Sequence, residues 1–202
     1  MEPVEIEVKF HVGDVGSLRR AIEALGAEDR GEVFETNIRY EDAGNTLVQN
    51  RSLLRLRQDN AAVLTYKSDA EDADPQYKVR RELEVTVSDF DAMHQILNAL
   101  GFHREQVYEK RRRIYKLGDA VLCLDAMPFG DFLEIEGPKP DIRRIADGLN
   151  LVWENRILTN YLNIFSMIRK DLNLGFADIT FDNFRSVGPV DMARYLDHLM
   201  AG

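Results

Sequence analysis

The sequence has little cysteine and little histidine: its 202 residues include one cysteine, Cys123, and four histidines. A single thiol excludes an intramolecular disulfide, and zinc sites need the histidine and cysteine ligands that are scarce here. Cys123 lies in the apolar run Val-Leu-Cys-Leu, which is typical of a buried side chain rather than a nucleophile. The histidines fall outside the motifs described below, and we expect ordinary core or surface residues at His11, His94, His103 and His198.

Long apolar runs and an excess of basic charge are also absent. No segment reaches the roughly 20 apolar residues of a membrane-spanning helix, and the N-terminus lacks a signal-peptide pattern. We therefore expect a cytoplasmic protein with no membrane partner. The formal net charge of −9 argues against a nucleic-acid partner, because broad nucleic-acid-binding surfaces need a basic excess. Any site for an anion must be local.

Alternating apolar and polar residues predict a largely β structure. With 45% hydrophobic and 30% charged residues, the chain is typical of a soluble globular protein. Consecutive strands joined as hairpins predict an antiparallel sheet of the α+β class, and about eight strands are enough to close a barrel. The expected strands span residues 4–10, 31–40, 52–58, 62–68, 78–87, 102–116, 120–126 and 131–136. The expected helices are 15–25, capped by Asp14; 89–100, capped by Ser88; 140–149; 160–172; and 190–200, with a turn at 42–45 and a loop at 71–75.

Charged side chains recur two residues apart along these strands. Residues i and i+2 of a strand share a face, so each pair points in a common direction. Such repetition predicts a sheet with one charged surface, and in a closed sheet these charges line the inside. Arg111 and Arg113 have the opposite parity and are expected on the outer surface. The pattern occurs at Glu5, Glu7 and Lys9; at Arg55 and Arg57; at Arg80, Glu82 and Glu84; at Lys110 and Arg112; and at Glu134 and Glu136, with Lys67 and Asp125 as single members.

The mixture of charges indicates a ligand that carries both phosphate and metal. Carboxylates are hard oxygen donors suited to Mg²⁺ or Mn²⁺, whereas lysine and arginine side chains suit phosphate oxygens. Together they indicate a divalent ion that bridges a polyphosphate, as in phosphoryl-transfer sites. No Walker-type glycine loop is present, so side chains rather than backbone amides would hold the phosphates.

These motifs resemble the CYTH superfamily, also called triphosphate tunnel metalloenzymes, which includes class IV adenylate cyclases, thiamine triphosphatases and inorganic triphosphatases. The resemblance implies an eight-stranded antiparallel tunnel with flanking helices over residues 1–165, followed by a C-terminal helical extension over 166–202. The motifs that carry it are E-x-E-x-K at Glu5–Lys9, R-x-R at Arg55–Arg57, Lys67, R-x-E-x-E at Arg80–Glu84, E-K-x-R at Glu109–Arg112 and L-D-x-x-P-F-G-x-F-L-E-I-E-G at Leu124–Gly137.

The resemblance also implies roles for individual residues. Water activation would involve Lys67 and a tyrosine, for which Tyr40 is the candidate; the alternative for Tyr40 is a core aromatic residue. Metal ligands or their close supports would be Glu5, Glu7, Asp125, Glu134 and Glu136, with Glu82 and Glu84 as further candidates. The phosphate ligands would be Lys9, Arg55, Arg57, Lys67, Arg80, Lys110 and Arg112.

Three functions stay open at this point. The leading expectation is a Mg²⁺- or Mn²⁺-dependent triphosphatase that hydrolyses tripolyphosphate, thiamine triphosphate or a nucleoside triphosphate such as ATP. The alternative is a class IV adenylate cyclase that makes cyclic AMP, but the histidine-phenylalanine pair of the bacterial enzymes is absent. The third is a non-catalytic polyphosphate or nucleotide sensor. Asn160-Tyr161 stands where the family usually has serine-tyrosine, and the segment after it could cap the tunnel, build a homodimer or bind a partner.

Overall fold

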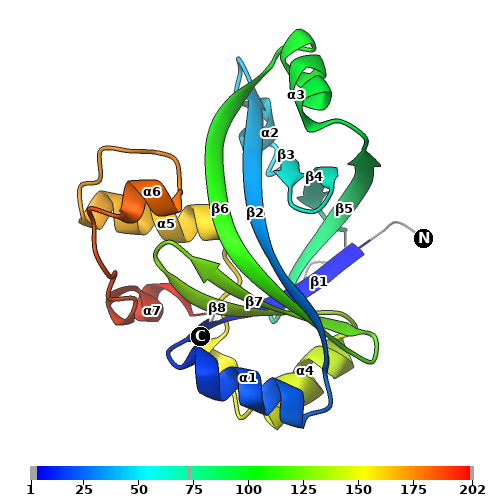
Figure 1. The fold of residues 1–202 in the computed structure, drawn as a ribbon, viewed down its shortest axis with the longest axis vertical. Helices are drawn as coiled ribbons and strands as arrows, with labels where there is room; N and C mark the ends of the chain where they lie inside the picture. The colour runs from blue at the N-terminus through cyan, green and yellow to red at the C-terminus, as the bar shows by residue number, and fades with distance from the viewer. Residues whose placement is uncertain (1–3, 72–73, 201–202) are drawn as a thin grey trace.

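The structure is a computed structural model that describes residues 4–71 and 74–200. Within these ranges, eight antiparallel strands close into a barrel in the order β1-β5-β4-β3-β2-β6-β7-β8 (Figure 1). The predicted α+β class and the closed eight-stranded barrel are confirmed. The strands are β1 (Val4–Val12), β2 (Glu28–Asp42), β3 (Leu53–Gln58), β4 (Ala62–Asp69), β5 (Lys78–Val87), β6 (Phe102–Leu117), β7 (Ala120–Met127) and β8 (Gly130–Glu136).

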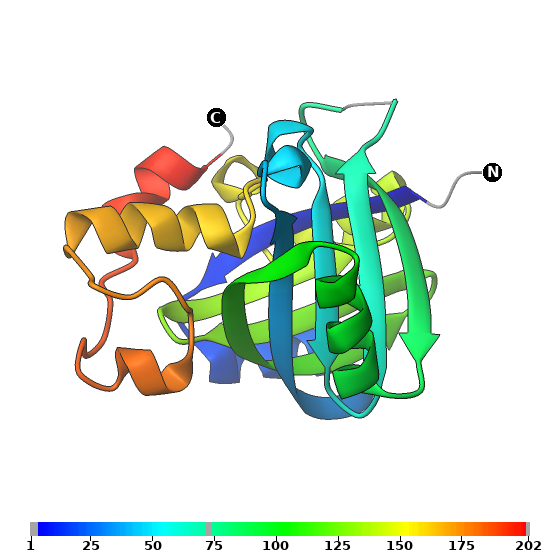
Figure 2. The ribbon, with the colours of Figure 1, turned by 90° about the horizontal axis from the view of Figure 1, so that it is seen from above.

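Helices cover the barrel in three groups (Figures 1 and 2). α1 and α4 pack on the outer faces of β1, β7 and β8, and α3 packs over β2, β3 and β6. The last helices, α5 to α7, gather as a lobe at one end of the barrel (Figure 2). The helices are α1 (Val15–Ala24), α2 (Thr46–Gln49), α3 (Phe90–Ala99), α4 (Lys139–Gly148), α5 (Tyr161–Asp171), α6 (Phe181–Phe184) and α7 (Ala193–Leu199), with a 3-10 turn at Trp153–Asn155.

Capping residues set the start of the main helices. Asp14 caps α1 as predicted, because its side chain accepts a hydrogen bond from a backbone N–H of the first turn. The predicted Ser88 cap of α3 is wrong: Asp89 is the residue whose carboxylate accepts from the first turn, at 2.9 Å. The loop expected at 71–75 includes residues 72–73, which lie outside the described residues.

The strand β2 is longer than the alternation predicts, and α2 was not predicted. β2 was expected at 31–40, but its pairing with β6 runs from Glu28 opposite Lys116 to Asp42 opposite Phe102. Each strand supplies the backbone partners that the other needs, so pairing extends beyond the segment with clear alternation. The two strands form a long ribbon that carries α3 at one end (Figure 1).

Because side chains alternate between the two faces of each strand, apolar side chains lie on the outside of the barrel wall and charged side chains lie on the inside. On the outside, Phe10, Leu133 and Ile135 are buried beneath α1 and α4. On the inside, Lys9 of β1 lies opposite Glu134 of β8 in the strand register. Each buried outer aliphatic side chain contributes about 1.5–3 kcal/mol to folding, whereas each inner charge needs a partner to offset its loss of hydration.

Residues outside the charged motifs lie where the sequence predicts them. Cys123 is 5% exposed, and burial raises the pKa of its thiol to about 12, as expected for an unreactive side chain. Arg111 lies exposed on the outer face, over the ring of Phe34. Arg113 forms an ion pair with Asp29 on the same outer face. In the described part of the chain, no helix combines the length and apolar character needed to cross a membrane.

Candidate active site

A cavity of about 210 Å³ lies inside the barrel. Its walls come from β1, β3, β4, β5, β6 and β8, and the start of α5 forms one end. Charged side chains dominate this lining, because the inward positions of six strands are the ones that carry the paired charges. The lining residues are Glu5, Glu7, Lys9, Leu53, Arg55, Arg57, Lys67, Lys78, Arg80, Glu82, Glu84, Tyr108, Lys110, Arg112, Glu134, Glu136, Asn160, Tyr161 and Leu162.

Every predicted phosphate ligand lines this cavity, together with one cation that sequence reasoning missed. The addition is Lys78, which shares its strand parity with Arg80 and could have been found from that parity. Arg80 lies near the rim, where it donates to the backbone carbonyl of Arg51 at 2.5 Å and pairs with Asp69 at 3.3 Å. The cations thus surround the cavity from several strands rather than from one loop.

The inner part of the cavity holds a tight group of ion pairs. The Nζ atom of Lys9 lies 2.7 Å from Glu134, and Lys110 lies 3.0 Å from Asp125. Arg112 pairs with both Asp125 and Glu134. Burial opposes the charge on Arg112, but these carboxylates outweigh it and raise the pKa of the guanidinium well above its usual value. These ion pairs fix the direction in which Lys9, Lys110 and Arg112 point.

Two carboxylates behind this group act as supports rather than as cavity walls. Asp125 is fully buried and, unlike the other predicted metal residues, does not line the cavity. Glu35, which sequence reasoning missed, lies 3.5 Å from Lys110. Burial raises the pKa of Glu35, but Lys110 and Arg112 more than offset this and lower it to about 2. The weak signal for Glu35 was its inward parity in β2.

Lysines and carboxylates alternate around the other part of the cavity. Lys67 lies 2.5 Å from Glu5 and 3.0 Å from Glu82. Lys78 lies 2.5 Å from Glu7. Burial would raise the pKa of Glu7, but Lys78 outweighs it and lowers the pKa to about 2. These lysines therefore occupy carboxylate oxygens that a bound cation could take.

Carboxylates also crowd one another in this region. Burial raises the pKa of Glu136 to about 7, and the negative charges of Glu5 and Glu7 add to the effect. Glu82 behaves alike: burial raises its pKa to about 7, with Lys67 opposing and Glu5 adding to the rise. Repulsion between carboxylates is relieved when a cation binds between them. Glu5, Glu7 and Glu136 are therefore carboxylates whose mutual repulsion a nearby cation would lower.

The donor set fits Mg²⁺ or Mn²⁺, although the side chains do not converge as a ready ligand cage. Within the described ranges, no three histidine, cysteine, aspartate or glutamate side chains are placed so as to hold a metal ion. The reason is visible in the contacts, since Lys67 and Lys78 lie against Glu5 and Glu7. All the candidate donors are carboxylate oxygens, which hard divalent ions prefer.

The predicted pairing of Lys67 with Tyr40 is not present in this structure. Tyr40 has the outward parity of β2 and lies fully buried beneath α3, where its hydroxyl contacts His94 Nδ1 at 2.6 Å. Burial raises its pKa to about 12. Arg39, the residue before Tyr40, has the inward parity. Moving one position along the strand therefore changes whether a side chain points into the barrel or out of it. Of the two alternatives for Tyr40, its position in the structure corresponds to the core aromatic residue.

Two other tyrosines line the cavity. Tyr161, the first residue of α5, donates from its hydroxyl to Asp125 at 2.9 Å. The face of its ring lies 4.3 Å from the Nζ atom of Lys9, a cation–π contact. Tyr108 of β6 accepts a hydrogen bond from Arg55 at 3.3 Å. These tyrosines orient the cations around them and were not selected from the sequence.

The closed antiparallel barrel with a charged interior is the architecture that the resemblance to triphosphate tunnel proteins implies. A family model described as CYTH domain matches residues 3–161. The chain therefore belongs to the CYTH domain family. The segment after residue 161 lies outside the match.

Known proteins with similar sequences or structures agree with this assignment. A protein of Methanocaldococcus jannaschii named "putative adenylate cyclase" is 28% identical over 173 residues, which cover 80% of this chain and 98% of the relative. A solved structure from Pyrococcus horikoshii is 32% identical, with a TM-score of 0.65 over 78% of this chain and 96% of that one. A Hippeastrum protein described as a "putative adenylyl cyclase" with a dominant triphosphatase activity is 15% identical, with a TM-score of 0.57 over 81% of this chain and 95% of that one. This last likeness concerns the fold alone.

Proposed function

We propose that this protein is a divalent-metal-dependent triphosphatase that binds a linear triphosphate inside the barrel. The observation that carries the proposal is the ring of lysine and arginine side chains around one cavity of about 210 Å³. Pockets for drug-sized organic ligands measure about 300–1,000 Å³. The smaller space suits a phosphate chain, with any organic group left outside.

The phosphate chain would be held by side chains whose charge is already fixed. Arg55 and Arg112 offer planar guanidinium groups that can each bind two phosphate oxygens. Lys9 and Lys110 offer ammonium groups whose direction is set by Glu134 and Asp125, at 2.7 and 3.0 Å. Because these groups are oriented before the ligand arrives, little reorganisation opposes binding.

Glu5, Glu7 and Glu136 would hold a divalent ion, with Glu82 and Glu84 near them in the cavity wall. Such an ion, when bound, neutralises phosphate charge and orients the reacting phosphoryl group. Lys67 now donates to Glu5 and Glu82, and a phosphate oxygen would compete with these carboxylates for the same ammonium group. We assign Lys67 to the terminal phosphate, where its charge would stabilise the transition state.

A class IV adenylate cyclase is the second candidate, favoured by the name of the Methanocaldococcus jannaschii relative. Cyclisation needs a place for the ribose and base beside the phosphates. Leu53 and Leu162 are the purely apolar side chains in the cavity lining, which offers little surface for a base. A non-catalytic polyphosphate or nucleotide sensor stays as a third candidate, and turnover separates it from the other two.

A single panel tests these functions. Purified protein is incubated with tripolyphosphate, thiamine triphosphate or ATP in the presence of Mg²⁺ or Mn²⁺, and phosphate, pyrophosphate and cyclic AMP are measured together. We expect phosphate release that is lost in Lys67→Met and kept in Lys170→Met, a substitution on the exposed end of α5. Cyclic AMP as the main product would favour the cyclase, and binding without turnover would favour the sensor.

A further inference from the structure

One buried arginine lies outside the cavity and outside the charged motifs. Arg156 follows the 3-10 turn of Trp153–Asn155 and is 7% exposed. Its guanidinium donates from Nε to the backbone carbonyl of Gln76 and from Nη1 to that of Trp153, each at 3.0 Å. Both acceptors are uncharged. Burying a cation costs free energy unless its surroundings compensate, so the contacts that this arginine makes need a reason.

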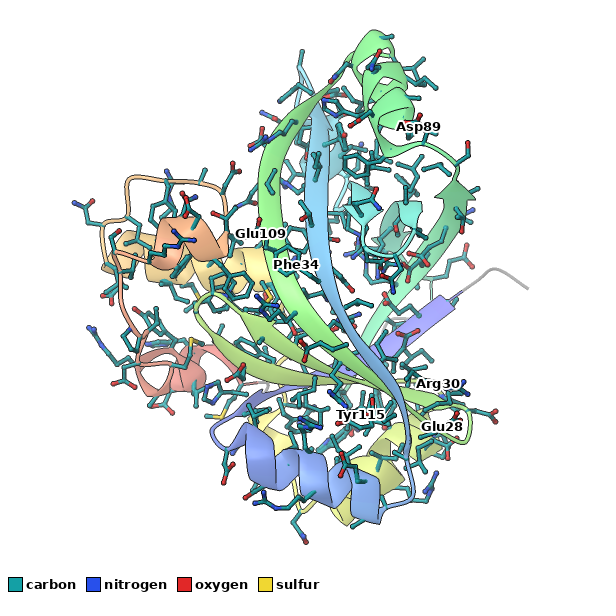
Figure 3. All side chains as sticks on the ribbon, viewed as in Figure 1. Glu28, Arg30, Phe34, Asp89, Glu109 and Tyr115 are labelled. Atoms are coloured by element: carbon teal, nitrogen blue, oxygen red, sulfur yellow. The ribbon has the colours of Figure 1, made fainter. Side chains whose placement is uncertain are left out.

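The ring of Trp153 fixes the direction of this guanidinium. The guanidinium lies 5.1 Å from the ring centroid, and that of Arg143 in α4 lies 4.7 Å from the same ring. Trp153 is 6% exposed and belongs to the apolar cluster beneath α1 and α4. Figure 3 shows Tyr115, a fully buried member of that cluster, between the strands and these helices. A cation–π contact with a closely packed ring leaves Arg156 little freedom to move.

The carbonyl of Gln76 belongs to a turn that leads directly into β5, the Asp74–Tyr77 turn. The N–H of Tyr77 donates to the carbonyl of Asp74 at 3.1 Å, and the N–H of Gln76 donates to the Asp74 carboxylate at 2.8 Å. Lys139 of α4 pairs with the same carboxylate at 2.7 Å. The rings of Tyr77 and Trp153 meet edge to face at 5.5 Å. The turn is therefore attached both to α4 and to the 3-10 turn.

The residue after this turn is Lys78, the cavity cation that the charge pattern did not reveal. Lys78 is the first residue of β5, and its ammonium group lies 2.5 Å from Glu7. That contact occupies a carboxylate oxygen of a proposed metal ligand, so Lys78 has to turn toward phosphate when a divalent ion binds. The position of its backbone sets how far the ammonium group can reach.

The residue after Arg156 contacts a second cavity cation. Ile157 exchanges two backbone hydrogen bonds with Lys9, at 2.7 and 3.2 Å, and Met200 bridges Ile157 on its other side. Lys9 is a proposed phosphate ligand that lines the cavity. Two consecutive residues, Arg156 and Ile157, therefore contact the turn before Lys78 and the backbone of Lys9.

We propose that Arg156 is a positioning residue for the phosphate site: by holding the Asp74–Tyr77 turn, it fixes where β5 begins. This contact sets the spacing between Lys78 and Lys9 in the cavity wall. The proposal rests on the proposed function. Both lysines would contact phosphate in the bound state, whereas Lys67 is assigned to the transition state. Loss of Arg156 is therefore expected to weaken triphosphate binding more than it slows the chemical step.

The test compares Arg156→Met with the matched control Arg143→Met in the full chain. Both arginines lie over the ring of Trp153, but the side chain of Arg143 is 48% exposed and pairs with Asp147 within α4. Its loss removes a cation–π contact without touching the turn. The kcat and KM for tripolyphosphate are measured with Mg²⁺, and calorimetry gives the Kd. Amide hydrogen exchange at Tyr77 reports whether the turn is held.

For Arg156→Met we expect faster exchange at Tyr77, a KM and a Kd raised about tenfold, and a kcat within about threefold of the wild type. Arg156→Lys is expected to recover part of the binding, because an ammonium group can still donate to one of the two carbonyls. Arg143→Met is expected to match the wild type in every measurement. A fall in kcat with wild-type KM and Kd overturns the proposal, since a merely structural loss lowers the amount of folded enzyme and leaves its affinity unchanged.

Asp74→Asn loosens the same turn from its exposed side and decides the matter if Arg156→Met does not fold. It is expected to speed exchange at Tyr77 and to raise the KM about threefold. Wild-type exchange and KM in Asp74→Asn would then overturn the proposal. Wild-type protein that neither binds nor hydrolyses tripolyphosphate overturns the proposed function and this proposal with it. Wild-type turnover with an unchanged Kd in Arg156→Met overturns this proposal alone.

Discussion

The hydroxyl group of Tyr161 donates a hydrogen bond to Asp125 across 2.9 Å, and so links the start of α5 to the most buried carboxylate of the barrel. Asp125 also holds Lys110 and Arg112, which line the cavity. The end wall and the proposed phosphate ligands therefore share one anchor. Changes at either residue test how strongly the two are coupled.

Replacing Tyr161 by phenylalanine removes this hydrogen bond but keeps the ring beside Lys9. We expect a loss of about 1–2 kcal/mol in the free energy of unfolding, because the bond joins a buried donor to a charged acceptor. Urea unfolding of the variant and the wild type measures this loss of stability. Tyr77→Phe is the control, since its hydroxyl makes a longer bond of 3.4 Å to a backbone carbonyl. An equal loss in both variants contradicts the special role of Tyr161.

Asp125→Asn leaves Lys110 and Arg112 with fewer negative partners inside the barrel. Breaking a buried ion pair costs about 3–5 kcal/mol, and we expect a loss near the lower figure because Glu35 and Glu134 remain. Thermal and urea unfolding give the change in stability. Asp119→Asn, an exposed position in the β6–β7 turn, is expected to unfold like the wild type. If Asp125→Asn were as stable as the wild type, that result would falsify the role of Asp125 as the shared anchor.

Stability is expected to fall in acid partly because of Glu35. Its pKa is lowered from 4.5 to about 2 in the folded protein, so its contribution is fully present above pH 4.5 and is lost as the pH falls toward 2. Glu35→Gln is therefore expected to cost on the order of 2 kcal/mol at pH 7 and much less near pH 2.5. Denaturant unfolding at both pH values measures the difference. Glu32→Gln, exposed on the same strand, serves as the control, and a pH-independent loss in Glu35→Gln contradicts the prediction.

Gly137 at the end of β8 is expected to tolerate no side chain. Its φ is +148°, and a Cβ atom there would lie 3.0 Å from the Cα atom of Ala120. Gly137→Ala is expected to destabilise the protein by about 1–3 kcal/mol through strain and crowding. Gly175→Ala meets nothing within 4 Å and is expected to be neutral or slightly stabilising. Similar melting temperatures for the two variants contradict this explanation.

The barrel and most of its charged lining could be predicted because strand parity is a local property. Glu5, Glu7 and Lys9 share a face whatever the rest of the chain does, and the same holds for Glu134 and Glu136. Tyr40 shows where local reasoning fails. Its parity was readable, but only the closed sheet tells which side is inside, and α3 then covers the outer one.

The missed residues depend on contacts between distant segments. The nearest inward-pointing residues on either side of Glu35 in its own strand are uncharged, so the strand shows no charge pattern there. The role of Glu35 comes from its ion pair with Lys110, which is far away in the sequence. Tyr161 begins a helix whose direction into the barrel is set by packing of the C-terminal lobe. Likewise, the position of Asp125 behind the wall depends on burial, which the motif L-D-x-x-P-F-G does not specify. The path of residues 172–180 has no periodic signal at all.

The bridge from Met200 to Ile157 and on to Lys9 bears on how the protein is made. During synthesis β1 leaves the ribosome long before Met200, so Lys9 gains its link through Ile157 to Met200 only after the segments between them have been made. Closure of the barrel also waits, because β1 needs β8 from the second half of the chain. Such long-range pairing slows folding. Until β8 has been made, the nascent chain exposes the edge of β1, and such unpaired strand edges make a chain prone to aggregation.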